Sequence, residues 1–225
     1  MENTKRKYTI TKTERKVVDG DLRNKERTKQ KWIDAVGAVL REKGYAGLTV
    51  KNIVEKAQMD RRLIALYFGD VNILIEEYLN SADYWMSRVA PKFNSIIEQS
   101  DTFGKEEITA ILHTLFDEVN TSDDLLKILN WEVGEYHDRL RELADNREKM
   151  SKPMFKLTDD DFKDTAINLR AVVALLISGI YYLTMHAKVN GSTFCEIDIN
   201  KPKGKKAIKE ALAKVMELVY RESKK

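Results

Sequence analysis

Apolar positions recur at helical spacing along most of this chain. The clearest case opens the stretch TVKNIVEKAQMDRRLIALYF, residues 49–68, in which Val50, Ile53, Val54 and Ala57 fall at i, i+3, i+4 and i+7. This spacing predicts a short amphipathic helix with one buried face.

A second short helix is predicted after a three-residue interruption at 58–60. Ile64 and Phe68 form its inward i, i+4 pair, Asp60 is its expected cap, and Thr49 is the expected cap of the helix before it. Two short helices joined by so tight a turn are typical of a helix-turn-helix, whose second helix enters the DNA major groove. The outward side of the second helix is predicted to carry Arg61, Arg62, Ala65 and Leu66, with Tyr67 at its edge.

The same pattern also has an ordinary structural explanation. Short helical hairpins are common, and a pair of arginines on a helix is usually only a solvated face. Tyr67 is equally suited to core packing beside Phe68. The flanking sequence therefore has to decide between the two interpretations.

The flanking pattern predicts helices throughout. A first helix is expected over Lys25–Lys43, with Trp32, Val36 and Leu40 inward, and Gly44 ends it as a C′ glycine does. Further helices are expected over about 71–88 (with Pro91 bending this helix or starting a new one), 91–99, 108–120, 123–146, 160–185 and 205–222, and loops over 147–157 and 189–204.

Composition supports an all-α fold. Leu, Ile, Ala, Lys and Glu dominate the 225 residues, and only three prolines and ten glycines are available for the turns of a sandwich or barrel. The apolar run from Ala171 to Leu183 is interrupted by Ser178 and Gly179. It is shorter than the ~20 residues of a membrane span, so a buried core helix is expected there.

Charge is unevenly distributed. Residues 1–70 hold 17 Lys and Arg against 10 Asp and Glu, whereas residues 71–225 hold 22 against 26. A basic front on a mildly acidic remainder favours contact with a polyanion. Residues 1–23 show no sustained period, and we expect a flexible basic arm. It is either simply disordered or follows the DNA backbone.

The order helix, glycine turn, short helix, tight turn, short helix resembles the N-terminal DNA-binding domain of the TetR family of bacterial transcriptional regulators. The resemblance covers about residues 27–80. It rests on Gly44-Tyr45, Thr49-Val50, Ile53, Ala57, Tyr67-Phe68 and Leu74.

Three positions depart from the family pattern. The family usually has glycine where this chain has Gln58, and a residue other than glycine costs about 1 kcal/mol there if φ is positive. The family commonly has tyrosine at the position of Ala65 and a phosphate-binding lysine at the position of Val71. Two DNA contacts that are usual in the family are therefore missing. Lys51, Arg61 and Arg62 can supply positive charge in their place.

The resemblance implies a DNA-binding domain over residues 24–70, after the arm, and a helical regulatory and dimerisation domain over residues 71–225. It further implies a homodimer on double-stranded DNA, held together by the last two helices, and release of DNA when an unidentified small molecule binds the regulatory domain. The predicted function is thus a sequence-specific regulator, of the repressor type by resemblance. The alternative is a helical protein–protein adaptor that kept the fold and lost operator binding.

The predicted DNA contacts follow from residue chemistry. Arginine presents a planar fork that pairs bidentately with guanine or grips a phosphate. A thymine methyl suits Leu66, and the tyrosine hydroxyl can donate to a phosphate. The N–H groups at the start of the first short helix form an anion site. The predicted DNA-binding residues are Thr49, Lys51, Arg61, Arg62, Leu66 and Tyr67.

A small-molecule cavity is expected between the helices of the regulatory domain. Its candidate lining residues are aromatic or imidazole side chains, which at helical spacing are more often core: Trp85, Phe116, Trp131, Tyr136, Tyr181 and His186.

No catalytic, metal or cofactor site is predicted. The histidines His113, His137 and His186 lack the spacing of a metal site, and no GxSxG, Walker or GxGxxG motif occurs. Asp159-Asp160-Asp161 is better explained as acids at a helix start than as a cation site. A single cysteine, Cys195, and an N-terminus without an apolar segment favour a cytoplasmic protein without a membrane partner.

Overall fold

The structure is a computed structural model that describes residues 18–82, 90–98 and 103–225, with the side chains of residues 18–23 and Ile97 left out. Within these ranges the chain is helical, and its extended pairing is limited to an isolated bridge between Phe194 and Ile197. The helices are α1 (Val18–Lys43), the 3₁₀ turn η1 (Tyr45–Gly47), α2 (Val50–Ala57), α3 (Arg62–Phe68), α4 (Val71–Ser81), α5 (Ala90–Glu98), α6 (Lys105–Thr121), α7 (Asp123–Gly134), α8 (Asp138–Lys156), α9 (Asp159–Phe162), α10 (Leu169–Asn190) and α11 (Pro202–Glu222). The predicted all-α class is confirmed.

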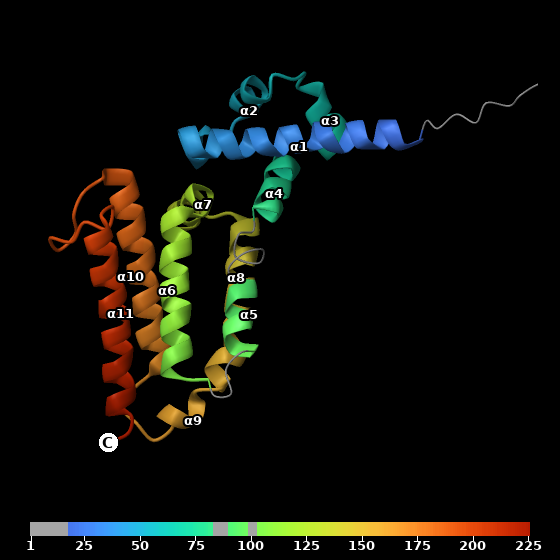
Figure 1. The fold of residues 1–225 in the computed structure, drawn as a ribbon. Helices are drawn as coiled ribbons and strands as arrows, with labels where there is room; N and C mark the ends of the chain where they lie inside the picture. The colour runs from blue at the N-terminus through green and yellow to red at the C-terminus, as the bar shows by residue number, and fades with distance from the viewer. Residues whose placement is uncertain (1–17, 83–89, 99–102) are drawn as a thin grey trace, which may run out of the picture.

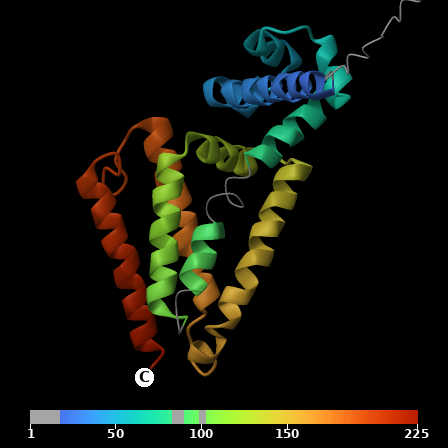
Figure 2. The same cartoon turned by 45° about the vertical axis from the view of Figure 1, so that its right-hand side comes forward.

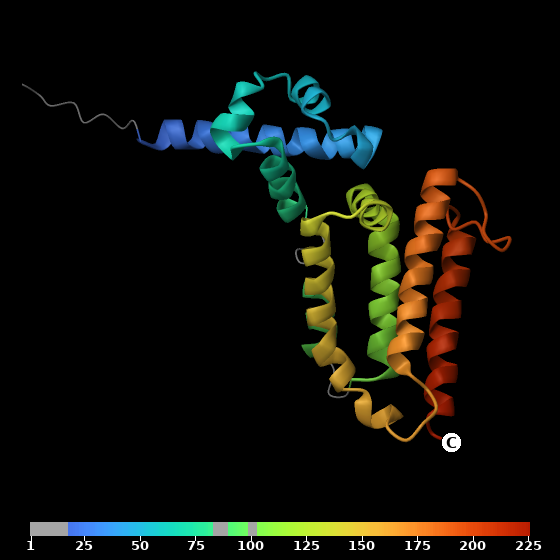
Figure 3. The same ribbon diagram turned by 180° about the vertical axis from the view of Figure 1, so that it is seen from behind.

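Helices α1 to α4 form the upper part of the molecule (Figure 1). Helix α1 runs above the bundle, α2 lies on the side of α1 that is turned away from the bundle, and α3 runs from there across α1 towards α4 (Figures 1 and 3). Trp32 and Ile53 are fully buried between these helices, together with Leu74 of α4. Helix α1 begins at Val18, so residues 18–23 of the predicted arm are helical, while the rest of that arm, 1–17, lies outside the described residues.

The lower part is a bundle in which α6 is central. Helices α10 and α11 both pack against α6, and α5 and α8 lie on its other side (Figures 1 and 2). The α6 residues Leu112, Leu115, Phe116 and Val119 are fully buried, as expected from their spacing. Helix α7 lies across the end of the bundle nearest to α1.

The two parts share one hydrophobic core at their junction. Ile128 and Trp131 of α7 and Leu140 and Leu143 of α8 belong to the same buried cluster as Trp32 of α1. Arg41 of α1 also donates to the Asp124 carboxylate of α7 over 2.6 Å. The buried cluster of the N-terminal helices thus includes side chains of α7 and α8.

Three of the secondary-structure predictions are wrong. The helix expected over 123–146 is broken at Glu135–His137, where the chain reverses from α7 into α8. The loop expected over 147–157 is the second half of α8. Pro153 lies inside that helix, held there because Met154 is buried and Phe155 packs on the core. The helix expected from Asp160 is interrupted, and α10 begins only after Asn168, whose side chain caps it.

Several local predictions are confirmed. Pro91 lies in the first turn of α5, and Ser122 caps α7 through its Oγ, which accepts from Leu125 N–H over 3.2 Å. The three aspartates Asp159–Asp161 form the first turn of α9.

Helix α10 is less buried than its composition predicts. Leu175 is 75% exposed, and Tyr182 and Val189 of the same helix are also exposed. These residues recur along one face, so the helix presents an apolar stripe to the outside. The prediction that this helix is buried on several sides is therefore wrong for the single chain.

Candidate nucleic-acid interface and ligand cavity

Helices α2 and α3 form a helix-turn-helix with a left-handed residue in the turn. Gln58 ends α2 with φ 53° and ψ 43°, and its backbone N–H donates to the Val54 carbonyl over 2.9 Å. This conformation stops α2 and redirects the chain into α3. The condition named for this position is met, because φ is positive, and glutamine occupies the left-handed region at a cost of about 1–2 kcal/mol.

The start of α2 is anchored by side chains. Thr49 Oγ1 accepts from Asn52 N–H over 3.3 Å, which confirms the predicted cap. Asn52 in turn donates to the Gly47 carbonyl and accepts from Lys43 Nζ, each over 2.8 Å. Lys51, in the first turn, is exposed. The position of Lys51 and its positive charge thus agree with the predicted anion site, because the N–H groups at the start of a helix attract negative charge.

The outward face of α3 is as predicted. Ile64 is buried against the core, whereas Leu66 is 70% exposed, and Arg61 and Arg62 are exposed at the beginning of the helix. Tyr67 is half-buried and packs on the core. Tyr67 therefore fits the packing alternative, while its position at the edge leaves its hydroxyl as the candidate phosphate donor.

Arg62 is held by Asp60. Its backbone N–H donates to Asp60 Oδ1 over 2.9 Å, its Nη2 donates to Oδ2 over 2.7 Å, and its Nε lies 3.1–3.2 Å from both oxygens. Because the Arg62 side chain and backbone both donate to it, the pKa of the Asp60 carboxyl falls to about 2. The Arg61 side chain has no such partner among the described residues.

A cavity of about 680 Å³ lies in the bundle. Its walls come from α5, α6, α8 and α10, and most of them are apolar. This volume is within the range of small-molecule sites. The apolar wall is made by Phe93, Phe103, Ile108, Ile111, Leu112, Leu115, Ala144, Met150, Met154, Phe155, Val173, Ala174, Ile177 and Tyr181.

Ion pairs lie at the two ends of the cavity. Near α7, Arg147 donates to Glu132 over 2.6 Å, and both side chains are largely buried. At the opposite end Arg170 donates to Asp159 over 2.6 Å, and there both side chains are about half exposed. Lys152 and Lys156 also line the wall. Glu148 lies in the wall as well, so the charged lining residues are four cations and three anions.

Tyr181 is the member of the predicted ligand set that lines this cavity, and burial raises the pKa of its hydroxyl to about 12. Phe116 is fully buried in the bundle core, Trp131 packs in the junction, and Tyr136 is 69% exposed with its hydroxyl donating to Asp138. His186 contacts Ser192 through Nε2 over 2.8 Å, away from the lining. Trp85 lies outside the described residues.

The cavity residues between 147 and 156 were missed because a loop was expected where the second half of α8 lies. Leu140, Leu143, Arg147, Met150 and Met154 continue one helical face through the segment that was predicted as a loop. The helical spacing of these residues indicates a continuing helix, but the proline at 153 favoured the prediction of a loop.

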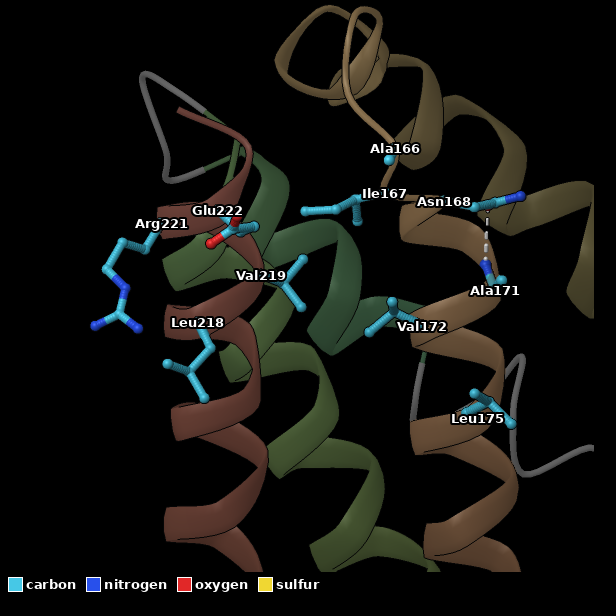
Figure 4. Close-up of a pocket in the computed structure, with 10 residues that line it drawn as sticks. All are labelled: Ala166, Ile167, Asn168, Ala171, Val172, Leu175, Leu218, Val219, Arg221 and Glu222. Carbon is cyan, nitrogen blue, oxygen red and sulfur yellow. Dashed lines mark hydrogen bonds between the residues drawn. The ribbon is translucent and has the colours of Figure 1, made fainter. Parts of the chain in front are cut away.

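A groove of about 550 Å³ runs between α10 and α11. Figure 4 shows Val219 of α11 pointing towards Ile167 and Val172 on the opposite wall, with α6 behind them. Leu175 and Leu218 stand at its outer rim and are 75% and 40% exposed. The groove therefore continues the exposed apolar stripe of α10.

Comparison by sequence finds no matching protein-family model and no matching curated protein. Solved structures do match. The regulator FadR from Bacillus subtilis, in complex with stearoyl-CoA, has a TM-score of 0.60 at 14% identity, over 83% of this chain and 96% of that one. A TetR-like regulator from Rhodococcus sp. RHA1 has a TM-score of 0.61 at 12% identity, over 84% and 93%.

A third neighbour is NalD, the secondary repressor of the MexAB-OprM multidrug efflux pump in Pseudomonas aeruginosa. It has a TM-score of 0.57 at 17% identity, over 87% of this chain and 96% of that one. All three likenesses extend across both parts of the molecule, well beyond residues 27–80. The chain therefore has the TetR-like fold of bacterial transcriptional regulators.

Proposed function

We propose that the protein is a sequence-specific DNA-binding regulator, most simply a repressor, that acts as a homodimer and leaves DNA when a small molecule occupies its cavity. The observation that carries this proposal is the pair Arg61 and Arg62, exposed at the start of the second helix of a helix-turn-helix. In this motif the N-terminal residues of the second helix reach the base edges.

The proposed contacts divide into base readout and backbone contacts. Arg61, Arg62 and Leu66 form the exposed face that would enter the major groove. Thr49 and Lys51 would meet a phosphate at the start of α2, and Tyr67 would donate to a phosphate from the edge. Contacts of the second kind would position the protein without specifying sequence.

The exposed stripe on α10 supports a homodimer. In the most apolar 18-residue window of this helix only 22% of the residues are buried. By length and composition alone, α10 is long and apolar enough to cross a membrane. The core helices of soluble proteins meet the same criteria. A second copy that covers α10 and α11 with its own α10 and α11 would bury the stripe and make a four-helix interface.

The cavity supports regulation by a mostly apolar ligand. The wall of the cavity is mostly aliphatic and aromatic, and two lysines in it, Lys152 and Lys156, suit a ligand with an anionic group. The fold neighbour from B. subtilis was solved with stearoyl-CoA, a molecule of this general kind. Helix α7 carries Glu132 in the cavity wall and Trp131 in the junction, so a ligand that displaces this wall would move the junction.

A helical adaptor without operator binding is the second candidate. It is favoured by Ala65, which leaves a small, exposed position on α3 where the family usually has tyrosine, and by Val71 in place of the usual lysine. In that case the protein would bind no DNA sequence preferentially. Either function suits a cytoplasmic protein.

Selection of bound sequences from random DNA tests the proposal. A palindromic consensus, with affinity that falls steeply as salt is added, is the expected result. The double variant Arg61→Ala/Arg62→Ala should lose specific binding while its circular dichroism spectrum and melting temperature stay those of the wild type. Absence of any enriched sequence, or unchanged affinity in the double variant, would contradict it.

A further inference from the structure

Asp60 places a negative charge in the surface that is proposed to contact DNA. It lies in the turn of the helix-turn-helix, next to the two arginines proposed to meet DNA, and its side chain is 47% exposed. A carboxylate at that place is repelled by the phosphates of the duplex. Asp60 is not the cap that the sequence predicts, because α3 has Arg61 at its N-cap position with no side-chain cap hydrogen bond. Accepting from the Arg62 backbone N–H does not require the charge, because asparagine and serine oxygens accept from such groups about as well as aspartate.

The contacts of Asp60 supply the explanation. Its two oxygens take the Nε edge and one Nη2 hydrogen of the Arg62 guanidinium, while its Oδ1 also accepts from the Arg62 backbone N–H. An arginine has five N–H donors in a planar fork, and this pairing leaves the distal edge, formed by Nη1 and Nη2, unpaired. That edge has the geometry that pairs with O6 and N7 of guanine.

The orientation also lowers the entropic cost of binding. An arginine side chain has about 2 kcal/mol of rotamer freedom, and the Arg62 side chain is 86% exposed. Without Asp60 it would sample many rotamers and contact phosphates and bases alike. Arg61 has no such restraint on its side chain and is free to follow a phosphate.

We propose that Asp60 is a positioning residue that orients Arg62 for guanine readout, and that Arg61 is instead a phosphate contact. The twin arginines thus have different roles, one for specificity and one for affinity. This inference rests on the proposed DNA-binding function and assigns the part of each residue within it.

The test measures base preference and salt dependence separately. Full-length wild-type protein and the variants Asp60→Asn, Arg62→Ala, Asp60→Asn/Arg62→Ala and Arg61→Ala are titrated against fluorescently labelled consensus DNA, against each single-base variant of the half-site, and against unrelated DNA. Asp60→Asn keeps one oxygen that can accept from the Arg62 backbone N–H, and it removes the charge together with the second acceptor for the guanidinium. Asp70→Asn is the matched control, because Asp70 caps α4 through the same kind of hydrogen bond and holds no arginine.

Arg62→Ala should lower affinity for the consensus by at least about tenfold and abolish the preference for guanine at one position of each half-site. Asp60→Asn should weaken the preference at that same position, with melting temperature unchanged, and should have no further effect in the double variant. Arg61→Ala should lower affinity for consensus and unrelated DNA equally and reduce the salt slope by about one per subunit. Asp70→Asn should leave base preference as in the wild type.

Two outcomes would overturn the inference while the proposed function stands. One is a base preference in Asp60→Asn identical to that of the wild type. The other is a uniform rise in its affinity for all DNA, which would make Asp60 a mere competitor of the phosphates. If the wild-type protein selects no consensus at all, the proposed function itself fails and the inference falls with it.

Discussion

The ring of Tyr45 lies parallel to the indole of Trp131, with centroids 6.1 Å apart and 7° between the ring planes. Tyr45 belongs to η1 in the N-terminal part and Trp131 to α7 of the bundle. His137 contacts the other side of the indole edge-on, with centroids 4.9 Å apart. A methyl group at Gly134 would lie 3.0 Å from the Tyr45 hydroxyl, so glycine admits this approach. This stack joins the two parts of the molecule.

Replacing Trp131 by alanine should lower the free energy of unfolding by about 3–5 kcal/mol, since it removes a buried aromatic ring and leaves a cavity in the junction. Trp131→Phe should cost less, because a ring remains on Tyr45. Urea unfolding followed by circular dichroism measures both. Val133→Ala, at a 72% exposed position of the same helix, should change the free energy by less than about 0.5 kcal/mol. Equal stability of Trp131→Ala and this control would refute the role of the stack.

Gln58→Gly should raise the free energy of unfolding by about 0.5–1 kcal/mol. Glycine removes the Cβ strain at φ 53°, and its extra freedom in the unfolded chain offsets part of the gain. Gln58→Ala keeps a Cβ at the same exposed position and should be close to neutral. Thermal melting of the three proteins in parallel checks this, and a glycine variant that melts below the wild type would count against the left-handed turn.

Leu175→Glu should convert the proposed dimer to a monomer, because it places a charge in the apolar stripe on α10. Helical content should be retained, since Leu175 is 75% exposed in the single chain. Sedimentation equilibrium gives the association state, and operator affinity should fall in parallel. Leu157→Glu, at a 56% exposed leucine after α8, is the control and should stay dimeric. A wild-type protein that is monomeric at micromolar concentration would remove the basis of this prediction.

Stability should decline in alkaline solution because of buried phenols. Burial raises the pKa of Tyr181 to about 12, above its unfolded value of about 10, so the folded state resists ionisation. The stability that depends on the neutral hydroxyl is complete below pH 10. It is lost as the pH rises from 10 through 12, by up to about 2–3 kcal/mol.

Burial also raises the pKa of Tyr78 and Tyr220, so the decline should involve more than one residue. Tyr181→Phe, which cannot ionise, should flatten the curve of unfolding free energy against pH. Tyr182→Phe, at a neighbouring exposed position, should leave the curve as it is. Urea midpoints measured between pH 8 and about 12 provide the comparison. Identical curves for Tyr181→Phe and the wild type would contradict the prediction.

Local signals in the sequence were sufficient for the helix-turn-helix. The apolar spacing of 49–68 and the Thr49 cap depend on residues within one or two turns of each other, and both predictions are confirmed. The same holds for Pro91 and Ser122 at the starts of α5 and α7. Propensity and capping act over such short ranges, so they can be read without knowledge of the fold.

The ligand cavity and the breaks between the later helices depended on contacts across the chain. Met154 and Phe155 keep Pro153 inside a helix by packing on residues far away in sequence, and Tyr45 meets the end of α7 at Gly134. Aromatic spacing alone did not distinguish Tyr181, which lines the cavity, from Phe116, which fills the core.

The sequence by itself determined the all-helical class, the helix-turn-helix motif and the identity of its exposed arginines. Only the tertiary structure decided which side chains face the cavity, which apolar face stays open on α10, and that Asp60 holds one arginine and not the other. The physical reason is that burial and ion pairing depend on three-dimensional neighbours, whereas helical period and caps depend on the adjacent residues of the chain.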